Sequence, residues 1–404
     1  MKIRLLKIKI RKINIWDIWV FLTVCILVIP DGIGHIIPAI EKLFYKWGLY
    51  AVYAGILFMF AIKIHSYKHL TKNFHCLITF SGITIFILFL KGHNFSAWYS
   101  AFSPCLFIAL FAEANRHSLN KVISSFLIVL EFWIYVNFIL MLMFPNGMYY
   151  LENNNSYLNW VLGYKSSLQY YVLPALCFSW INLKYTDQKL RYILLLSVCW
   201  ASTIISSNSM LLVGLFFFTV FQFSRLWNVG KLFNIWTYYG VDLAANVVIV
   251  FFLTWFTNTA LGFRLLSYLG KTATISRRAS IIWPMTLEYI KNNAVFGNGF
   301  YTTQARTVMY GGILGFIHSH NQLMEILFIG GVLMSAFYVN LHIQIGESLS
   351  KNKTPVSKIL SVSIFVLYLM MSVEVFTRIV AAPIWFILYI AGNCELVHNA
   401  YLKN

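Results

Sequence analysis

Residues 257–331 read TNTALGFRLLSYLGKTATISRRASIIWPMTLEYIKNNAVFGNGFYTTQARTVMYGGILGFIHSHNQLMEILFIGG. This is the longest stretch of the chain that is not continuously apolar. Elsewhere, apolar runs of about 18 residues recur along the whole length, and runs of that length are the signature of transmembrane helices. The stretch is therefore expected to contain a large polar loop set into a membrane-embedded scaffold.

The composition supports a membrane protein. Of the 404 residues, 59% are hydrophobic and 11% are charged, whereas charged residues make up about 25% of soluble domains. A bilayer forces backbone groups to pair within the segment, and the apolar runs do not alternate with polar residues as barrel strands do. The expected fold is all-α, with residues 1–404 forming one polytopic membrane domain.

Hydropathy predicts twelve transmembrane helices, near residues 16–30, 47–62, 74–90, 95–113, 122–144, 168–183, 190–206, 209–224, 235–256, 320–342, 359–376 and 380–396. With the N-terminus inside, the inner segments hold 20 Lys and Arg residues and the short outer loops hold 5. This bias places both termini in the cytoplasm and the loop 257–319, between helices nine and ten, outside. The basic N-terminus is expected to lead into an uncleaved first helix.

The net charge of +18 does not indicate nucleic-acid binding, because the basic residues flank apolar runs as positive-inside topology requires. Acidic residues are few. They form no carboxylate cluster that would suggest a divalent metal and no evident pair for glycoside hydrolysis. Any reaction is therefore expected to need no metal. The sequence also has no evident nucleotide-binding motif, and no other cofactor is expected.

Within the loop, residues 281–293 predict a short helix lying on the membrane surface. Trp283, Leu287 and Ile290 fall on one face of it. Gly297-Asn298-Gly299 then interrupts the helix. A plain turn is the favoured interpretation of this triplet, with a phosphate-binding nest as the alternative.

The loop ends in His318-Ser319-His320-Asn321, directly before an apolar run. His320 stands where an outward-facing helix begins, and the positive end of a helix disfavours imidazolium. A neutral imidazole can accept a proton from a sugar hydroxyl. His318 is equally suited by its chemistry, and Asn321 is expected to cap the helix or orient the ring. A histidine that only forms hydrogen bonds at the interface is the alternative.

Adjacent guanidiniums at Arg277 and Arg278 suit bidentate contacts to phosphate, with lipid headgroup binding as the alternative. Further basic residues expected on the outer side complete a pocket for a pyrophosphate: Arg264, Arg306, Lys165 and Arg378. An internal ion pair between Glu374 and Arg378 is the other interpretation of the last of these.

The order of these motifs resembles that of the O-antigen polymerase and ligase superfamily. An arginine, Ile-Trp, Gly-x-Gly and then His-Asn leading into a helix are matched by Arg278, Ile282-Trp283, Gly297-Asn298-Gly299, His320-Asn321, Leu323 and Gly330-Gly331. The match assigns the histidine position to His320. The arginine spacing in the family is often one residue shorter, so Arg277 and Arg278 stay unranked.

The resemblance implies a membrane glycosyltransferase of the GT-C type. Such an enzyme takes a glycan from undecaprenyl pyrophosphate on the outer side of the cytoplasmic membrane and transfers it to an acceptor hydroxyl. His320 would be the general base, and Arg277 or Arg278, with Arg264 or Lys165, would stabilise the departing pyrophosphate. The implied partners are the lipid-linked oligosaccharide, the bilayer and other polysaccharide-assembly proteins.

We favour a repeat-unit polymerase, whose acceptor is another lipid-linked glycan. A ligase that transfers a finished polysaccharide to a final acceptor is the alternative. A flippase for lipid-linked oligosaccharides is the alternative of another class, but paired halves and a central charged cavity, which would favour it, are not evident in the sequence.

Overall fold

The computed structural model describes residues 14–92, 94–150, 158–223, 235–257, 259–268, 277–312 and 317–403. Within these ranges the chain has 18 α-helices and one two-stranded antiparallel hairpin. The all-α class is confirmed, and the hairpin was not predicted.

The α-helices are α1 Ile15–Leu27, α2 Asp31–Ile36, α3 Pro38–Ile40, α4 Leu49–Ile64, α5 Lys72–Lys91, α6 Phe95–Ala114, α7 Leu119–Met143, α8 Gln169–Leu183, α9 Lys189–Ile205, α10 Ser209–Phe223, α11 Ile235–Thr257, α12 Ala260–Tyr268, α14 Trp283–Asn292, α15 Thr303–Met309, α16 Gln322–Lys351, α17 Pro355–Met371, α18 Ala382–Gly392 and α19 Cys394–Leu402. Shorter elements are π-helical turns at Glu41–Gly48 and Arg278–Ile282, 3-10 turns at Arg116–Ser118, Lys165–Leu168 and Ile379–Ala381, and strands β1 Asn159–Trp160 and β2 Gly163–Tyr164.

The predicted apolar segments all fall on helices, but not all of their ends agree. The helix predicted at 359–376 is α17, which ends five residues earlier than predicted, at Met371. The segment 380–396 is divided between α18 and α19, which are bent by 86°. Among the described residues, five helices are long and apolar enough to cross a membrane, or six if this bent pair is one crossing. The chain is therefore a multi-pass membrane protein, and the number of twelve crossings stays a prediction.

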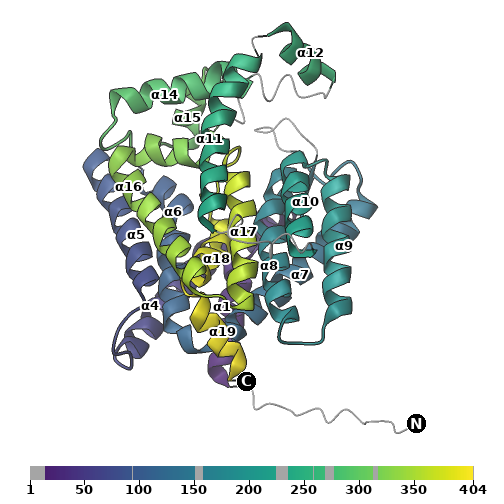
Figure 1. The fold of residues 1–404 in the computed structure, drawn as a ribbon, viewed down its shortest axis with the longest axis vertical. Coiled ribbons are helices and arrows are strands. Elements are labelled where there is room, and N and C mark those ends of the chain that lie inside the picture. The colour runs from purple at the N-terminus through teal and green to yellow at the C-terminus, as the bar shows by residue number, and fades with distance from the viewer. Residues whose placement is uncertain are drawn as a thin grey trace.

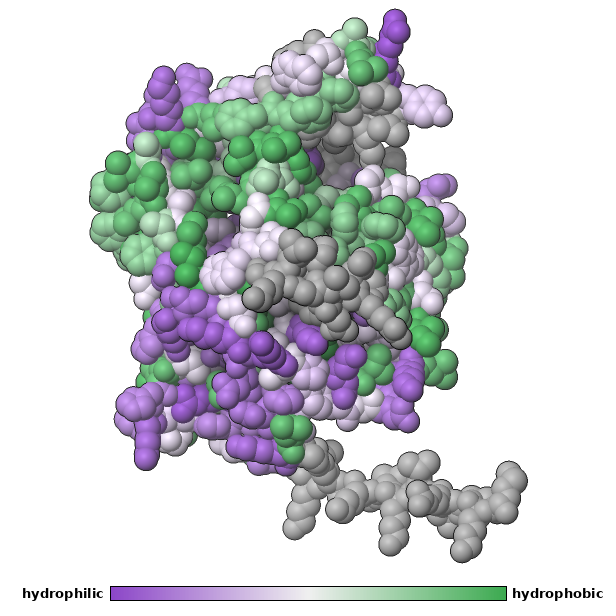
Figure 2. Space-filling model, viewed as in Figure 1, coloured by the Kyte–Doolittle hydropathy of each residue, from purple (hydrophilic) through white to green (hydrophobic). Residues whose placement is uncertain are grey.

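Helix α18 lies in the middle of the bundle (Figure 1). Its sequence is apolar all round, and such a helix must be covered on every side. Ten of its eleven residues are buried, against α6, α8, α16 and α17. Space-filling colours separate a largely apolar upper part from a hydrophilic end beside the C-terminus (Figure 2). The helices α14 and α15 lie at the opposite end from the C-terminus (Figure 1).

Helix α16 is broken at Gly331, where φ is 61° and ψ is −158°. These angles lie in a region that essentially only glycine adopts. The break leaves backbone groups on both sides without their intrahelical partners, and those groups must be paired elsewhere when they are buried. The expectation of one continuous transmembrane helix starting at His320 is thus corrected: a short helical segment precedes the break.

The loop at residues 294–299 pairs the backbone groups that the break sets free. The amides of Val332 and Leu333 donate to the carbonyls of Ala294 and Val295 at 2.8 and 3.1 Å. In return, the amides of Asn298 and Gly299 donate to the carbonyls of Phe328 and Ile329 at 2.7 and 2.9 Å. The amides of Asn298 and Gly299 are therefore used inside the protein, and the turn interpretation of Gly297-Asn298-Gly299 fits better than a phosphate nest.

The short helix predicted at 281–293 is present as the π-helical turn followed by α14, but its apolar face is divided. Trp283 is 1% exposed, and its indole Nε1 donates to the carbonyl of Ser319 at 3.0 Å. Leu287 on the same predicted face is 40% exposed. Trp283 therefore supports the histidine loop from inside the protein and does not anchor the helix in lipid.

Candidate functional site

The histidine loop ends in a strained residue followed by a helix cap. His320 has φ 53°, a conformation that is uncommon for residues other than glycine and that concentrates at functional sites. Asn321 is the N-cap of α16: its side-chain oxygen accepts from the amide of Met324 at 3.0 Å. The cap fixes where the helix begins and so holds the strained residue beside it.

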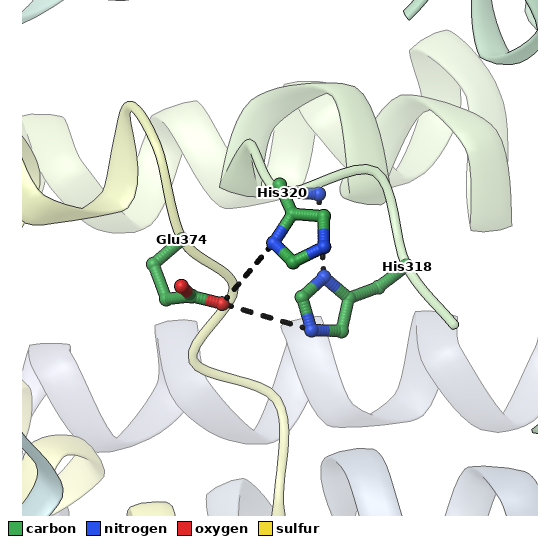
Figure 3. Close-up of side chains that lie close together, drawn as sticks. All are labelled: His318, His320 and Glu374. Atoms are coloured by element: carbon green, nitrogen blue, oxygen red, sulfur yellow. Dashed lines mark hydrogen bonds and ion pairs between the residues drawn. The ribbon is translucent and has the colours of Figure 1, made fainter. Parts of the chain in front are cut away.

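Two histidines and one carboxylate meet at this loop (Figure 3). An oxygen of Glu374 lies 3.5 Å from Nδ1 of His320 and 3.6 Å from Nε2 of His318. The amide of His320 donates to Nδ1 of His318 at 3.3 Å. All three side chains are largely buried, with 12% of each histidine and 15% of Glu374 exposed. A carboxylate beside Nδ1 favours the tautomer that leaves the lone pair on Nε2 of His320.

The segment that carries Glu374 is held from several elements. Asn321 donates to the carbonyl of Ser372 at 2.9 Å, and Arg278 donates to the carbonyl of Val373 at 3.0 Å. Beyond Glu374, two further bonds fix the backbone: the hydroxyl of Tyr170 donates to Val375 at 2.8 Å, and the amide of Phe376 donates to Gln322 at 2.7 Å. The carboxylate is therefore placed by a rigid backbone, although it lies between helices.

The charges of the cluster follow from its burial. Burial, and next the charge of Arg278, lowers the pKa of His320, and burial together with His320 lowers the pKa of His318 well below its usual value. Burial alone would raise the pKa of Glu374, but the imidazoles and Arg278 outweigh it and hold that pKa below the usual range. At neutral pH the histidines are uncharged and the carboxylate is ionised. This is the state that a general base and its orienting group require.

The two adjacent arginines have different environments. Arg277 is exposed. Arg278 extends to the segment of Glu374, and its buried Nε has no hydrogen-bond partner among the described residues. Of the pair, only Arg278 is brought to the histidines; which of the two contacts a pyrophosphate stays a prediction.

Arg378 acts on the pKa of both histidines and therefore lies near the cluster. Burial would lower the pKa of Arg378, but Tyr170, Asp31 and Glu374 together raise it, so its positive charge is secure. Lys165 follows Tyr164, whose ring centroid is 5.8 Å from its Nζ. Burial raises the pKa of Tyr164. Glu374 raises it further and Arg278 lowers it, so Tyr164 lies close to both residues. Glu374 was expected inside a helix as the partner of Arg378, but it lies in a loop and faces the histidines.

The other predicted substrate ligands are placed differently. Arg306 is buried, with its guanidinium 2.5 Å from a carboxylate oxygen of Glu325 and 3.6 Å from the ring centroid of Phe328. Arg264 is exposed on α12, which packs on α11 at the upper edge of the view (Figure 1). Asn321 caps α16, and its side-chain amide donates to the carbonyl of Ser372. The structure thus assembles His318, His320, Arg278 and Arg378, and it gives Arg306 and Asn321 internal partners.

The cluster also has a donor set suited to a metal ion. One ligand atom from each of His318, His320 and Glu374 lies within 4.8 Å of the others, and two histidines with one carboxylate form a familiar transition-metal set. This combination was not predicted, because Glu374 is more than fifty residues away from the two histidines in the sequence. The expectation of a metal-free site stays a prediction that chelation can test.

A cavity of about 520 Å³ adjoins the cluster. It is bordered by His318, Arg378, the pair Arg306–Glu325, the start of α6 and residues 300–304. His318 is therefore the histidine that faces open space in this arrangement.

Compared with known proteins, the chain matches no family model and no curated protein.

Proposed function

We propose that the chain is a membrane glycosyltransferase that joins lipid-linked glycans, most specifically a polysaccharide repeat-unit polymerase. The observation that carries the proposal is the pair formed by His320 and Glu374, 3.5 Å apart, with Arg278 and Arg378 beside it. A neutral base, a carboxylate that orients it and two nearby cations are the groups that glycosyl transfer from a pyrophosphate donor requires.

In the proposed reaction, His320 acts as the general base. Both of its ring nitrogens are buried in this structure, so the histidine loop must open for the acceptor to reach Nε2. The oxygen of the acceptor hydroxyl attacks the anomeric carbon of the donor glycan, and the hydroxyl proton passes to the imidazole. The bond from the anomeric carbon to the pyrophosphate oxygen breaks, and undecaprenyl pyrophosphate leaves with the electron pair. Glu374 stabilises the imidazolium that forms.

Arg278 and Arg378 are proposed to neutralise the leaving group. Charge builds on the pyrophosphate as the bond breaks, and fixed cations in a water-poor site are effective at that point. Lys165 is the third proposed contact. Arg264 would join this set only if α12 moved, and Arg306 would have to exchange Glu325 for the pyrophosphate.

The proposed orientation places the histidine cluster on the outer side of the cytoplasmic membrane and both termini inside, with twelve crossings in a GT-C-like arrangement. The excess of Lys and Arg in the segments expected inside, 20 against 5 in the short outer loops, supports this orientation. The cluster belongs to the end opposite the C-terminus, near α14 (Figure 1). The charged groups of the proposed site lie at one end of the molecule, which favours an enzyme over a flippase, for which charges in a central cavity are expected.

The deciding experiment compares His320→Ala, His318→Ala and wild type in the organism that carries the chain, with matched expression. Surface polysaccharide is resolved by size. A ladder collapsed to single repeats in His320→Ala supports the polymerase. Long chains that stay on the lipid carrier indicate a ligase instead. An unchanged ladder in His320→Ala refutes the general base, and a collapse in His318→Ala alone would transfer that role to His318.

A second measurement separates proton transfer from metal chemistry at the same residues. Purified protein is treated with a chelator, assayed for transfer, and analysed for bound metal. Unchanged activity without stoichiometric metal supports the base. Activity that is lost on chelation and restored by one transition metal would overturn the proposed mechanism.

A further inference from the structure

The cavity beside His318 is bordered by several elements that are far apart in sequence. Asn94 to Ala101, at the start of α6, form one wall, and Phe300 to Gln304, which lead into α15, form another. His318 and Arg378 border the side nearest the cluster. Its volume of about 520 Å³ falls within the roughly 300–1,000 Å³ typical of small-molecule sites.

The walls of the cavity are rich in uncharged hydrogen-bonding groups. Hydroxyl and amide side chains are contributed by Asn94, Ser96, Ser100, Thr302, Thr303 and Gln304. The ring of Tyr301 adds an aromatic surface. Such groups can both donate and accept, which suits the hydroxyls of a sugar, while an aromatic ring covers the apolar face of a sugar ring.

The charged residues of the lining do not make it an anion site. Arg306 and Glu325 form a pair with 4% and 6% of their side chains exposed, so their charges offset each other. Arg378 is the remaining cation of the lining, and it stands on the side of Glu374 and the histidines. A polyprenyl tail would leave the polar walls unpaired, and a pyrophosphate would meet one cation only.

We propose that this cavity binds one or two sugar residues of the glycan that is brought to the histidine cluster, and that Ser100 and Gln304 select which sugar is accepted. This inference rests on the proposed function, whose chemistry requires a glycan beside the histidines. Both residues are exposed and border the cavity, Ser100 from α6 and Gln304 from α15. A sugar in this cavity would lie against His318, whose ring centroid is 4.2 Å from that of His320.

The test measures binding apart from turnover. His320→Ala protein in lipid nanodiscs is mixed with an oligosaccharide prepared by partial hydrolysis of the host's own surface polysaccharide, and bound sugar is detected by saturation-transfer NMR. Ser100→Trp and Gln304→Trp, added separately, fill the cavity from either wall. The matched control is Val308→Trp, because Val308 lies on the same helix as Gln304, is 71% exposed and does not border the cavity.

The expected result is binding in His320→Ala and in the Val308→Trp control, and at least about tenfold weaker binding in both cavity variants. Equal binding in all four proteins overturns the inference, as does a signal that inorganic pyrophosphate abolishes at low concentration. If the cavity variants bind normally while His320→Ala stops polymerisation, the proposed function stands without this site. If they lose binding while His320→Ala polymerises normally, the sugar site stands and the proposed function fails.

Discussion

The amide of Ser319 donates to a carboxylate oxygen of Glu325 at 2.9 Å, and the other oxygen of that carboxylate lies 2.5 Å from a guanidinium nitrogen of Arg306. Arg306 thereby fixes the carboxylate of Glu325, and that carboxylate holds the backbone at Ser319, between the two histidines. The hydroxyl of Ser319 also donates to the carbonyl of Asn321 at 2.9 Å. The backbone between His318 and His320 is therefore held by a buried ion pair.

We predict that Arg306→Met and Glu325→Leu each destabilise the protein strongly. Removing one partner leaves a buried charge uncompensated, which costs about 3–5 kcal/mol. The double variant is expected to lose less unfolding free energy than the two single variants together, because neither charge is left buried without its partner. It should not recover fully, since the amide of Ser319 then lacks its acceptor, which costs about 1–3 kcal/mol. Thermal unfolding in one detergent measures all three.

The matched control is the pair Lys72–Glu347, 3.6 Å apart, with 72% and 37% of the side chains exposed. Such exposed pairs contribute about 1 kcal/mol or less. Additive losses in the Arg306–Glu325 cycle, or a loss no larger than in the control, would show that the buried pair does not hold the loop.

The break in α16 gives a second prediction. A Cβ atom on Gly331 would lie 2.4 Å from the carbonyl oxygen of Val295, and one on Gly297 would lie 2.5 Å from the backbone of Gly330. Both glycines have positive φ, so Gly331→Ala and Gly297→Ala combine strain of about 1–3 kcal/mol with a clash. Both are expected to lower the unfolding temperature and the transfer rate.

The control is Gly82→Ala in α5, where an added Cβ meets nothing within 4 Å. This change should be neutral or slightly stabilising. If Gly331→Ala changed the unfolding temperature as little as Gly82→Ala, α16 would tolerate a continuous helix. The backbone hydrogen bonds from residues 294–299 to the break would then not be needed.

Sequence reasoning found the features that local pattern encodes. Apolar run length predicted the helices, and the start of the tenth helix was predicted at His320, two residues before α16 begins at Gln322. It did not predict that Glu374 meets the histidines, because that contact joins two loops whose approach depends on the packing of α16 and α17. An acid near the end of an apolar run was its only signal.

Two further features depended on tertiary contacts that local patterns do not contain. Gly331 reads as one glycine in an apolar helix, and only the nearby carbonyls of residues 294–295 show why the helix breaks there. Arg306 reads as one of six loop cations, yet Glu325 neutralises it. Counting loop charges therefore overestimated the cations available to a pyrophosphate.

Arg278 and Arg277 provide a third prediction. Arg278→Lys keeps the charge but not the planar fork that contacts Val373. Transfer is expected to fall by about 10²–10³-fold, the effect of losing one preorganised electrostatic donor. Arg277→Lys and Arg277→Ala should stay within about twofold of wild type, because Arg277 is exposed. Steady-state transfer from purified lipid-linked donor, with unfolding temperatures measured in parallel, tests the ranking, which a larger effect at Arg277 would reverse.

The charges around His320 predict the pH dependence of transfer. A general base acts only when it is neutral, so the rate falls as pH drops through its pKa. Burial and Arg278 lower the pKa of His320 from its usual 6.5. The acid limb of kcat/KM should therefore lie below pH 6.5, with a flat profile from there to neutral pH.

Two variants should move this limb in opposite directions. Arg278→Gln removes a charge that lowers the pKa of His320, so the limb of its residual activity should move to higher pH. Glu374→Gln removes a group that raises this pKa, so its limb should move to lower pH and its rate should fall as the imidazolium loses its partner. Profiles between pH 5 and 8 test both signs. Shifts in the same direction, or a wild-type limb above 6.5, would mean that the titrating base is not the histidine held between these two charges.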